Sequence, residues 1–327
     1  MDEITSSGQP GSENPDSLES IADSIFSRHG IDFSAGQQAG GWTNAVWMTE
    51  ELVLRLSTQK ERKNLLYEAR LSAFLPSEVG YPQTVETGTT AGHAWTLAKK
   101  LPGTSLGEAW DDLQCEERVI ALQGLWARAQ AVHSVPCEDI ATIVSGRAWF
   151  NSTNPEEAEA SLTRLTQEGI FTPTETSGLQ DALSHFWGVL PSAPCVLCHG
   201  DLTMNNSMWH DGQVTALLDF EFAVLAPAQL DLNHLVKKAF GPDDAVTDVH
   251  EAQQLRQAVK KLALPILTQP GSKALLVGYA ILLELWLLEE WLAHPEGEGP
   301  LEQWDPLRRL RLLADGRGGY LAPLLPG

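Results

Sequence analysis

The chain has 327 residues, of which 43% are hydrophobic and eleven are tryptophan, which is enough apolar side chain for a well-packed globular protein. Its formal net charge of −21 argues against nucleic acid and anionic membranes as partners, because their phosphate groups would repel it. Cationic small molecules fit this charge, and so does a role of the acidity in solubility alone. At about 150 residues per domain, the length predicts two lobes.

The N-terminal residues 1–15 are rich in Gly, Ser, Pro and acidic side chains, which predicts a disordered tail. The first helix is expected to have Asp16 as its N-cap, with Glu19 three residues later, and to end at Gly30. Acidic residues stand where a secretion signal needs basic ones, and no apolar segment follows, so we expect a cytoplasmic protein.

A change in pattern at Pro102 divides the chain into two predicted lobes. Residues 16–102 read as a small sheet with one helix, and we expect this N-terminal lobe to bind a nucleotide. Residues 103–327 read as long amphipathic helices, and we expect this C-terminal lobe to carry the catalytic loop and the substrate site. In the first lobe we expect strands at 45–48, 52–56, 82–87 and 93–99 and a helix at 59–74.

The second lobe has few strand signals. They are a short strand at 194–198 and a hairpin of 207–209 and 214–218 around the turn Asp211-Gly212. A Pro/Thr/Gly-rich break is expected over 169–178. The helices are expected at 116–133, 179–189, 228–240, 249–264, 273–293 and 306–314.

Two motifs overlap in the stretch CVLCHGDLTMNN, residues 195–206. Its start matches C-x-x-C-H, a haem-attachment pattern, while its end matches the kinase loop H-x-D-L-x-x-x-N. Haem attachment usually occurs outside the cytoplasm. A C-x-x-C redox pair needs a helix that begins after its first cysteine. A zinc site would need two further ligands. The strand expected at 194–198 disfavours both haem attachment and a redox pair, and no further zinc ligands are evident. We therefore expect the four cysteines of the chain to be free thiols.

The kinase pattern makes demands that the following residues meet. Phosphoryl transfer needs a carboxylate for the acceptor's proton, and an amide oxygen and a second carboxylate for Mg²⁺. Asp201 and Asn206, five residues apart, supply the first two, and His199 can brace the loop. Asp219 ends the return strand of the predicted hairpin, so we expect it to hold Mg²⁺ together with Asn206.

The sequence resembles the aminoglycoside phosphotransferase and choline kinase-like family. The resemblance rests on the loop of residues 199–206, on Leu217-Leu-Asp219-Phe-Glu221 in place of D-F-G, and on Asp231-Leu232. Weaker similarities lie at residues 125–136 and 100–103. The family implies a two-lobed, protein-kinase-like α+β fold, a small antiparallel-sheet lobe and a mostly helical one, Mg²⁺, and ATP or GTP as donor. It also implies that Asp231 anchors the catalytic loop.

The nucleotide half of the resemblance is less regular. Arg55 stands where a kinase has its lysine, and Glu68 on the next helix is its expected partner. Base recognition is expected from the main chain around Ala98 and Lys100. The phosphate-covering loop is expected at Gly40, Gly41, Trp42, Thr43 and Asn44, although these residues do not form G-x-G-x-x-G.

The acceptor is the most open question. Acidic side chains could bind a cationic aminoglycoside or basic peptide antibiotic. Three of the candidates, Glu284, Glu289 and Glu290, could equally form the solvated face of one helix. A macrolide, choline or a sugar stays open as acceptor, as does a non-catalytic, pseudokinase-like binding protein. We expect a monomer or a dimer. The candidate acceptor residues are Asp201, Glu221, Glu284, Glu289 and Glu290.

Overall fold

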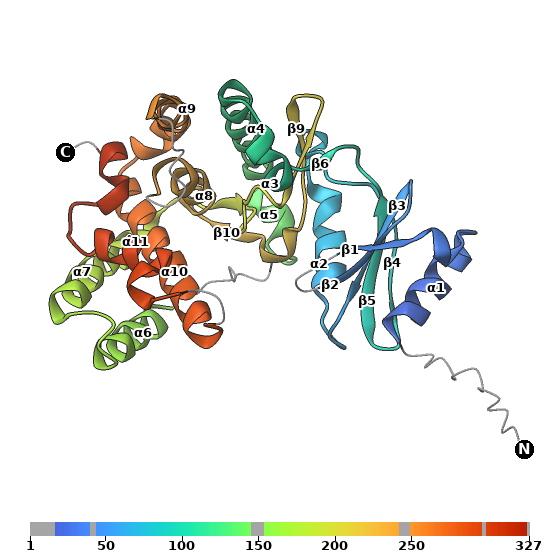
Figure 1. The fold of residues 1–327 in the computed structure, drawn as a ribbon, viewed down its shortest axis with the longest axis horizontal. Coiled ribbons are helices and arrows are strands. Elements are labelled where there is room, and N and C mark those ends of the chain that lie inside the picture. Colours follow the sequence, from blue (N-terminus) through green and yellow to red (C-terminus); the bar gives the residue numbers. More distant parts are fainter. Residues whose placement is uncertain (1–16, 40–43, 145–153, 242–248, 296–298, 326–327) are drawn as a thin grey trace, which may run out of the picture. The chain divides into compact units, whose positions relative to one another are not determined.

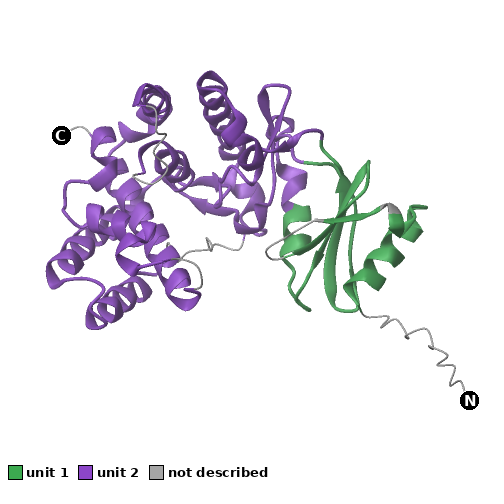
Figure 2. Ribbon diagram, viewed as in Figure 1, with its two compact units in different colours: residues 1–70, 82–101 green, residues 71–81, 102–327 purple. Residues whose placement is uncertain are grey.

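The computed structural model describes residues 17–39, 44–144, 154–241, 249–295 and 299–325 (Figure 1). The predicted tail over residues 1–15 lies outside these ranges. The chain divides into two compact units (Figure 2). Unit 1 comprises residues 1–70 and 82–101, and unit 2 comprises residues 71–81 and 102–327. We describe each unit by itself.

Unit 1 is built on one antiparallel sheet of five strands in the order β1-β2-β3-β5-β4. Helix α1 (Leu18–Arg28) has Ser17 as its N-cap, where the sequence analysis placed Asp16, because the Ser17 hydroxyl accepts from the Ser20 N–H. β1 was not expected. The strands are β1 (Gln37–Ala39), β2 (Asn44–Met48), β3 (Leu52–Ser57), β4 (Thr84–Thr90) and β5 (His93–Lys99).

Side chains on β3 alternate between the two faces of this sheet. Leu54 and Leu56 are buried in a core that also contains Ile25 and Phe26 of α1. Arg55, between the two leucines, therefore points to the opposite face, where it meets helix α2 (Asn64–Leu71). The apolar face of the sheet therefore packs against α1, and the charged side chain of Arg55 contacts α2 on the other face.

Helix α2 is shorter than the expected helix over 59–74. The hydroxyl of Ser57 donates to the Gln59 carbonyl, and the N–H of Glu61 donates to the Gly92 carbonyl, so the first residues are held in a turn. Glu61 has a φ of 64°, which no helix permits. After α2 the chain continues as a short 3₁₀ turn (Ser72–Phe74).

In unit 2 the long helix α4 (Cys115–His133) contacts strand β9 (Gln213–Leu217) and helix α9 (Val249–Leu267). Two small sheets lie in it, one pairing β7 with β10 and one ordered β6-β8-β9. β6, β10, α3, α5 and α6 were not expected. The strands are β6 (Thr104–Ser105), β7 (Val196–Cys198), β8 (Ser207–His210), β9 (Gln213–Leu217) and β10 (Val224–Ala226). The helices are α3 (Leu106–Ala109), α4 (Cys115–His133), α5 (Cys137–Ile140), α6 (Pro155–Gln167), α7 (Pro173–Val189), α8 (Gln229–Phe240), α9 (Val249–Leu267), α10 (Ser272–Ala293) and α11 (Asp305–Leu313).

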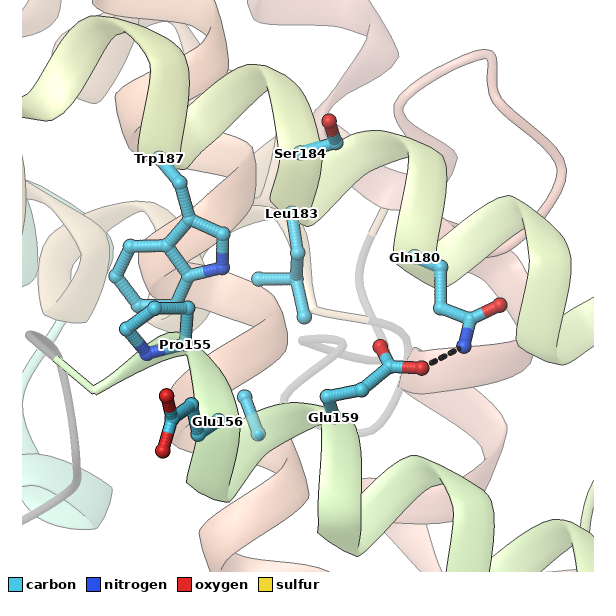
Figure 3. Close-up of a pocket in the computed structure, with 8 residues that line it drawn as sticks. Pro155, Glu156, Glu159, Gln180, Leu183, Ser184 and Trp187 are labelled. Atoms are coloured by element: carbon cyan, nitrogen blue, oxygen red, sulfur yellow. Dashed lines mark hydrogen bonds between the residues drawn. The ribbon is translucent and has the colours of Figure 1, made fainter.

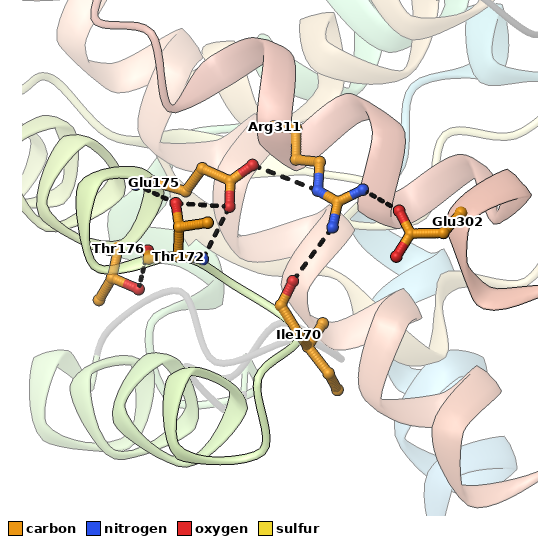
Figure 4. Close-up of polar contacts among 6 residues, drawn as sticks. All are labelled: Ile170, Thr172, Glu175, Thr176, Glu302 and Arg311. Atoms are coloured by element: carbon orange, nitrogen blue, oxygen red, sulfur yellow. Dashed lines mark hydrogen bonds and ion pairs between the residues drawn. The ribbon is translucent and has the colours of Figure 1, made fainter.

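Helix α7 begins inside the segment that was expected to be a break. Thr172 and Glu175 form a capping box, and Pro173 occupies the first turn, where its missing N–H has no consequence. Arg311 of α11 then pairs with Glu175 at 3.2 Å and with Glu302, and it donates to the Ile170 carbonyl at 3.3 Å (Figure 4). The guanidinium thereby ties the start of α7 to α11.

In the described part of the chain, no single helix combines the length and apolar character needed to cross a membrane. Helices α9 and α10 meet that test only as a pair, by length and composition, and they are bent by 120° relative to each other.

Candidate active site

The segment with the kinase-loop motif follows β7 directly. β7 pairs with β10, with Cys198 opposite Val224. The chain then turns at Gly200, whose φ is +83° and where a side chain would meet the Phe222 carbonyl at 2.1 Å. Only glycine fits this turn, so the conformation of residues 199–201 follows from it.

Asp231, near the start of α8, holds this turn. Its carboxylate is completely buried and accepts from the N–H of His199 at 2.9 Å and from the N–H of Gly200 at 3.0 Å. It also accepts from Nε2 of His133, at the end of α4, at 2.8 Å. Burial alone would raise the pKa of Asp231, but the hydrogen bond and charge of His133, with smaller help from His199 and Gly200, lower it below its usual value. The carboxylate therefore stays ionised and fully bonded.

The imidazole of His199 links the loop to the hairpin that follows it. Its Nε2 lies 2.8 Å from the Leu218 carbonyl, and its Nδ1 lies 3.3 Å from the N–H of Asp201. These partners require a proton on Nε2 and a lone pair on Nδ1. The buried ring thereby connects Asp201 to the residue before Asp219.

Asp201 and Asn206 are in contact. The amide nitrogen of Asn206 donates to the Asp201 carboxylate at 2.8 Å and to the Asp201 carbonyl at 3.0 Å. Both amide protons are therefore used within the loop, and the Asn206 side-chain oxygen accepts no hydrogen bond from the described residues. The geometry leaves that oxygen available as a metal ligand.

The β8–β9 hairpin brings Asp219 to the same place. Its register pairs Ser207 with Leu217, so the residues just outside the ladder, Asn206 and Leu218, also lie opposite each other. The N–H of Leu218 donates to the Asn206 carbonyl at 2.8 Å. Asp219 follows with a φ of 61°, the left-handed conformation, which Asp tolerates better than most residues.

The cysteines beside this loop are free thiols. Cys198 is buried in β7 and points toward the carbonyls of Ala226 and Pro227, and burial raises the pKa of its thiol. Cys195 is exposed. Cys195 precedes β7 and Cys198 ends it, so the two sulfurs lie in different surroundings. Both ring nitrogens of His199 are engaged by the backbone.

In unit 1, Arg55 and Glu68 form the expected pair, with Nη1 and Oε2 2.7 Å apart. Glu68 is buried, while about a fifth of the Arg55 side chain is accessible. Gly40, Gly41, Trp42 and Thr43 lie outside the described residues, and Asn44 is buried at the start of β2.

The expected base-recognition segment lies at the end of β5. Ala98 is paired in the sheet with Val53 and Thr84. The N–H of Lys100 donates to the Glu51 carbonyl at 2.7 Å. Because that N–H already has a partner, a nucleotide base would have to use other main-chain groups of this segment.

One acceptor candidate has to be withdrawn. Glu284 of α10 is completely buried and pairs with Lys237 at 3.0 Å and with Arg309 at 3.4 Å. A carboxylate enclosed between two cations in the core has no free face for a ligand. The sequence spacing suggested a solvated face because it does not show that α8 and α11 pack on this side of α10.

The other acidic candidates are accessible. Glu221 lies in the 3₁₀ turn (Phe220–Phe222) directly after Asp219. Glu289 pairs with Arg164 of α6, and Glu290 lies 3.9 Å from His294 with half of its side chain exposed. Glu289 therefore already has a cationic partner, whereas Glu290 is largely open to solvent.

A cavity of about 360 Å³ opens between α6 and α7 and contains none of the predicted site residues (Figure 3). Trp187 and Pro155 both line it, and Glu159 accepts a hydrogen bond from Gln180. The remaining lining residues are Glu156, Ala158, Leu183 and Ser184.

Both units carry a net negative charge. Unit 2, which contains the kinase-loop motif, has 31 acidic and 14 basic residues among 237, whereas unit 1 has 12 and 8 among 90. The acidic residues are therefore shared in proportion to length, and unit 2, which holds Asp201, has a formal net charge of −17.

Sequence reasoning missed the role of His133. His133 belongs to residues 125–136, a weaker similarity to the family, but the sequence gave it no role of its own. In the structure it ends α4 and is the side-chain partner of Asp231, 98 residues away in the chain.

The model of the phosphotransferase enzyme family matches residues 36–263. Among curated proteins, a sequence search finds no match. Solved structures of aminoglycoside phosphotransferases are similar in fold. A thermostable mutant of APH(4)-Ia with ADP and hygromycin B is 14% identical, with 92% of this chain and 99% of that chain covered and a TM-score of 0.62.

Two further solved structures are similar to this chain in fold over most of its length. ADP-bound APH(2'')-Ib is 12% identical, with 90% of this chain and 98% of that chain covered and a TM-score of 0.60. APH(2'')-IIia with GDP and kanamycin is 16% identical, with 91% and 98% covered and a TM-score of 0.61. The expected protein-kinase-like α+β fold is confirmed.

Proposed function

Because the chain belongs to the phosphotransferase enzyme family, we propose that it transfers the γ-phosphate of ATP or GTP to a hydroxyl of a cationic small molecule. The observation that carries the proposal is the convergence of Asp201, Asn206 and the end of β9 on one hydrogen-bonded loop. Asp201 takes the proton of the acceptor hydroxyl while the hydroxyl oxygen forms a bond to the γ-phosphorus. The bond from that phosphorus to the β-phosphate oxygen breaks, which leaves a nucleoside diphosphate and a phosphate ester.

The residues beside Asp201 fit Mg²⁺. Asn206 has an oxygen with no donor among the described residues, and Asp219 adds a carboxylate from the neighbouring strand end. Oxygen ligands from one or two side chains, completed by phosphates, are what Mg²⁺ prefers. When bound, the ion neutralises negative charge on the phosphates. Asn206 and Asp219 are therefore the residues that we assign to it.

Arg55 is our candidate for the nucleotide phosphates. Glu68 binds Nη1 of the guanidinium, about a fifth of the Arg55 side chain is accessible, and the planar fork of a guanidinium matches the geometry of phosphate oxygens. We also keep Gly40, Gly41, Trp42, Thr43 and Asn44 as the proposed phosphate-covering loop, and the main chain around Ala98 and Lys100 for the base.

The charge of unit 2 favours a cationic acceptor, since carboxylates attract such a ligand and orient it. The solved relatives carry hygromycin B or kanamycin, both aminoglycosides. We therefore propose an aminoglycoside or a basic peptide antibiotic as acceptor, held by Glu221 and Glu290 beside Asp201. A role in antibiotic resistance follows from this proposal.

A screen tests the proposal directly. Nucleoside diphosphate release is measured with ATP and with GTP against kanamycin, hygromycin B, tuberactinomycin-type peptides, macrolides and choline. We expect turnover with a cationic antibiotic, and its loss when EDTA removes Mg²⁺. Turnover with choline or a macrolide alone would refute an aminoglycoside or basic peptide antibiotic as the acceptor. Absence of metal-linked nucleotide binding in calorimetry would refute the enzyme and favour a pseudokinase-like binding protein.

Substitution of Arg55 tests the nucleotide assignment. We expect Arg55→Ala to raise the KM for ATP and to lower kcat/KM about 10- to 100-fold, because hydrogen bonds between charged groups contribute about 1.5–3 kcal/mol. Arg55→Lys keeps a cation for Glu68 but loses the two-pronged geometry, so an intermediate effect is expected. Arg70→Ala, an exposed position on α2, is the control. Equal effects of Arg55→Ala and Arg70→Ala would contradict the assignment.

A further inference from the structure

His234 is a buried titratable group that the proposed mechanism does not yet use. It lies on α8 three residues after Asp231, so it occupies the helix face that holds the catalytic loop. The ring is partly accessible, but its Nε2 is buried and has no hydrogen-bond partner among the described residues. A buried polar atom without a partner costs about 1–3 kcal/mol. Such an atom is rare enough in a native fold to require an explanation.

The charges around His234 are those of the catalytic loop and of α8 itself. Asp201, Asp231, Lys237 and His199 all act on its ring. Burial lowers the pKa of His234, and the two carboxylates oppose this effect only in part. The imidazole is therefore neutral near pH 7, with a proton on one ring nitrogen and a lone pair on the other.

Of the two carboxylates, Asp201 has the greater unused hydrogen-bonding capacity, because it accepts one hydrogen bond from the described residues whereas Asp231 accepts three. Both oxygens of Asp231 already accept hydrogen bonds, three in all. In Asp201, Oδ2 accepts from Asn206, while Oδ1 receives no hydrogen bond from the described residues. Asp231 accepts from the N–H of Gly200, the residue before Asp201, so the face of α8 that carries His234 packs against the loop. A buried ring nitrogen without a partner and a carboxylate oxygen without a donor among the described residues thus lie on two segments in contact.

We propose that His234 is a positioning residue for Asp201: in solution its Nε2–H donates to the Asp201 carboxylate, directly or through one water molecule. The inference rests on the proposed function, because it gives the imidazole a task only if Asp201 takes the acceptor's proton. Asn206 from the loop and His234 from α8 then restrain the carboxylate from two sides. A carboxylate restrained in this way keeps a lone pair aimed at the acceptor hydroxyl.

Magnetic resonance tests the contact without any acceptor. The ring nitrogen signals of His234 are assigned by their loss in His234→Asn, and they are then followed in the free protein. We expect Asp201→Asn to shift the Nε2 signal, while Asp211→Asn, in the exposed turn between β8 and β9, leaves it unchanged. An Nε2 signal that ignores Asp201→Asn overturns the proposal.

Kinetics test the consequence. The amide nitrogen of glutamine reaches about where Nε2 lies, whereas asparagine is too short. We expect His234→Asn to lower kcat about 10- to 100-fold with the KM for ATP unchanged, and His234→Gln to restore most of the loss. His185→Asn, exposed on α7, is the control. The rate is measured with the acceptor found in the screen and as slow transfer of phosphate from ATP to water.

The outcomes separate the two ideas. Wild-type turnover in His234→Asn overturns the inference and leaves the proposed function standing. Equal losses in His234→Asn and His234→Gln, with the same drop in Tm, also overturn it, because they indicate a structural role alone. Failure of the wild-type protein to transfer phosphate to any acceptor or to water refutes the proposed function, whereas the nitrogen signals still decide whether His234 and Asp201 are paired.

Discussion

Asp201→Asn is expected to lower kcat by about 10²–10⁴-fold, the usual contribution of a positioned proton acceptor. The substitution keeps the shape of the side chain and its contact with Asn206, because an amide oxygen still accepts the hydrogen bond that Asn206 donates at 2.8 Å. It removes only the charge and the basic oxygen that takes the acceptor's proton. Steady-state rates with the acceptor found in the screen, together with calorimetric nucleotide affinity, measure the effect.

Asp211→Asn is the matched control for this substitution. Asp211 also belongs to unit 2, its side chain is largely exposed, and its φ of 48° is a conformation that asparagine tolerates well. We expect normal rates from this variant and an unchanged Tm from both. If Asp201→Asn turned over as fast as Asp211→Asn, Asp201 could not be the proton acceptor.

Asp219→Asn is expected to abolish the Mg²⁺-dependent part of nucleotide binding, because a neutral amide is a much weaker ligand for this hard cation than a carboxylate. Asparagine is preferable to alanine here. The residue has a φ of 61°, and alanine in the left-handed region would add backbone strain of roughly 1–2 kcal/mol to the loss of the ligand. Titration of ATP by calorimetry, with and without Mg²⁺, measures the difference.

Binding of ATP without the ion separates metal loss from misfolding. We expect that residual affinity to be the same in Asp219→Asn, Asp211→Asn and the wild type. A Mg²⁺-linked gain in affinity that survives in Asp219→Asn would show that the metal has other ligands. Asn206 would then need to be reconsidered together with Asp219.

The catalytic loop and its hairpin could be predicted from sequence because local spacing determines them. Asp201 and Asn206 are five residues apart, and the turn Asp211-Gly212 predicts the hairpin that returns Asp219 toward Asn206, although an irregularity between Met208 and Trp209 shifts the register by one residue. Gly200 marks the sharp turn within the motif itself. No contact with a distant segment is needed to see this arrangement.

Two features that depend on distant segments could not be predicted. The burial of Glu284 depends on Lys237 and Arg309, which come from two other helices. Likewise, His133 is an unremarkable helix end until α8 places Asp231 beside it. A single sequence shows the period of a helix but does not show which of its faces a later helix will cover.

The start of α7 shows a competition between local signals. Its Pro, Thr and Gly residues favour a loop by composition, yet Thr172, Pro173 and Glu175 are also the residues that begin helices. The packing of the helix then decides. Gly178 lies so close to the Ala314 carbonyl that a side chain there would meet it at 1.9 Å.

The buried carboxylate of Asp231 has a consequence for the energetics of ligand recognition. Since it accepts from two successive amides of the loop and is itself bonded to His133, contacts within the protein fix the shape of the bend. Little conformational entropy is then lost there when nucleotide and acceptor arrive, so more of the intrinsic binding free energy remains as affinity. The entropic cost of ordering this segment falls on the folding reaction instead.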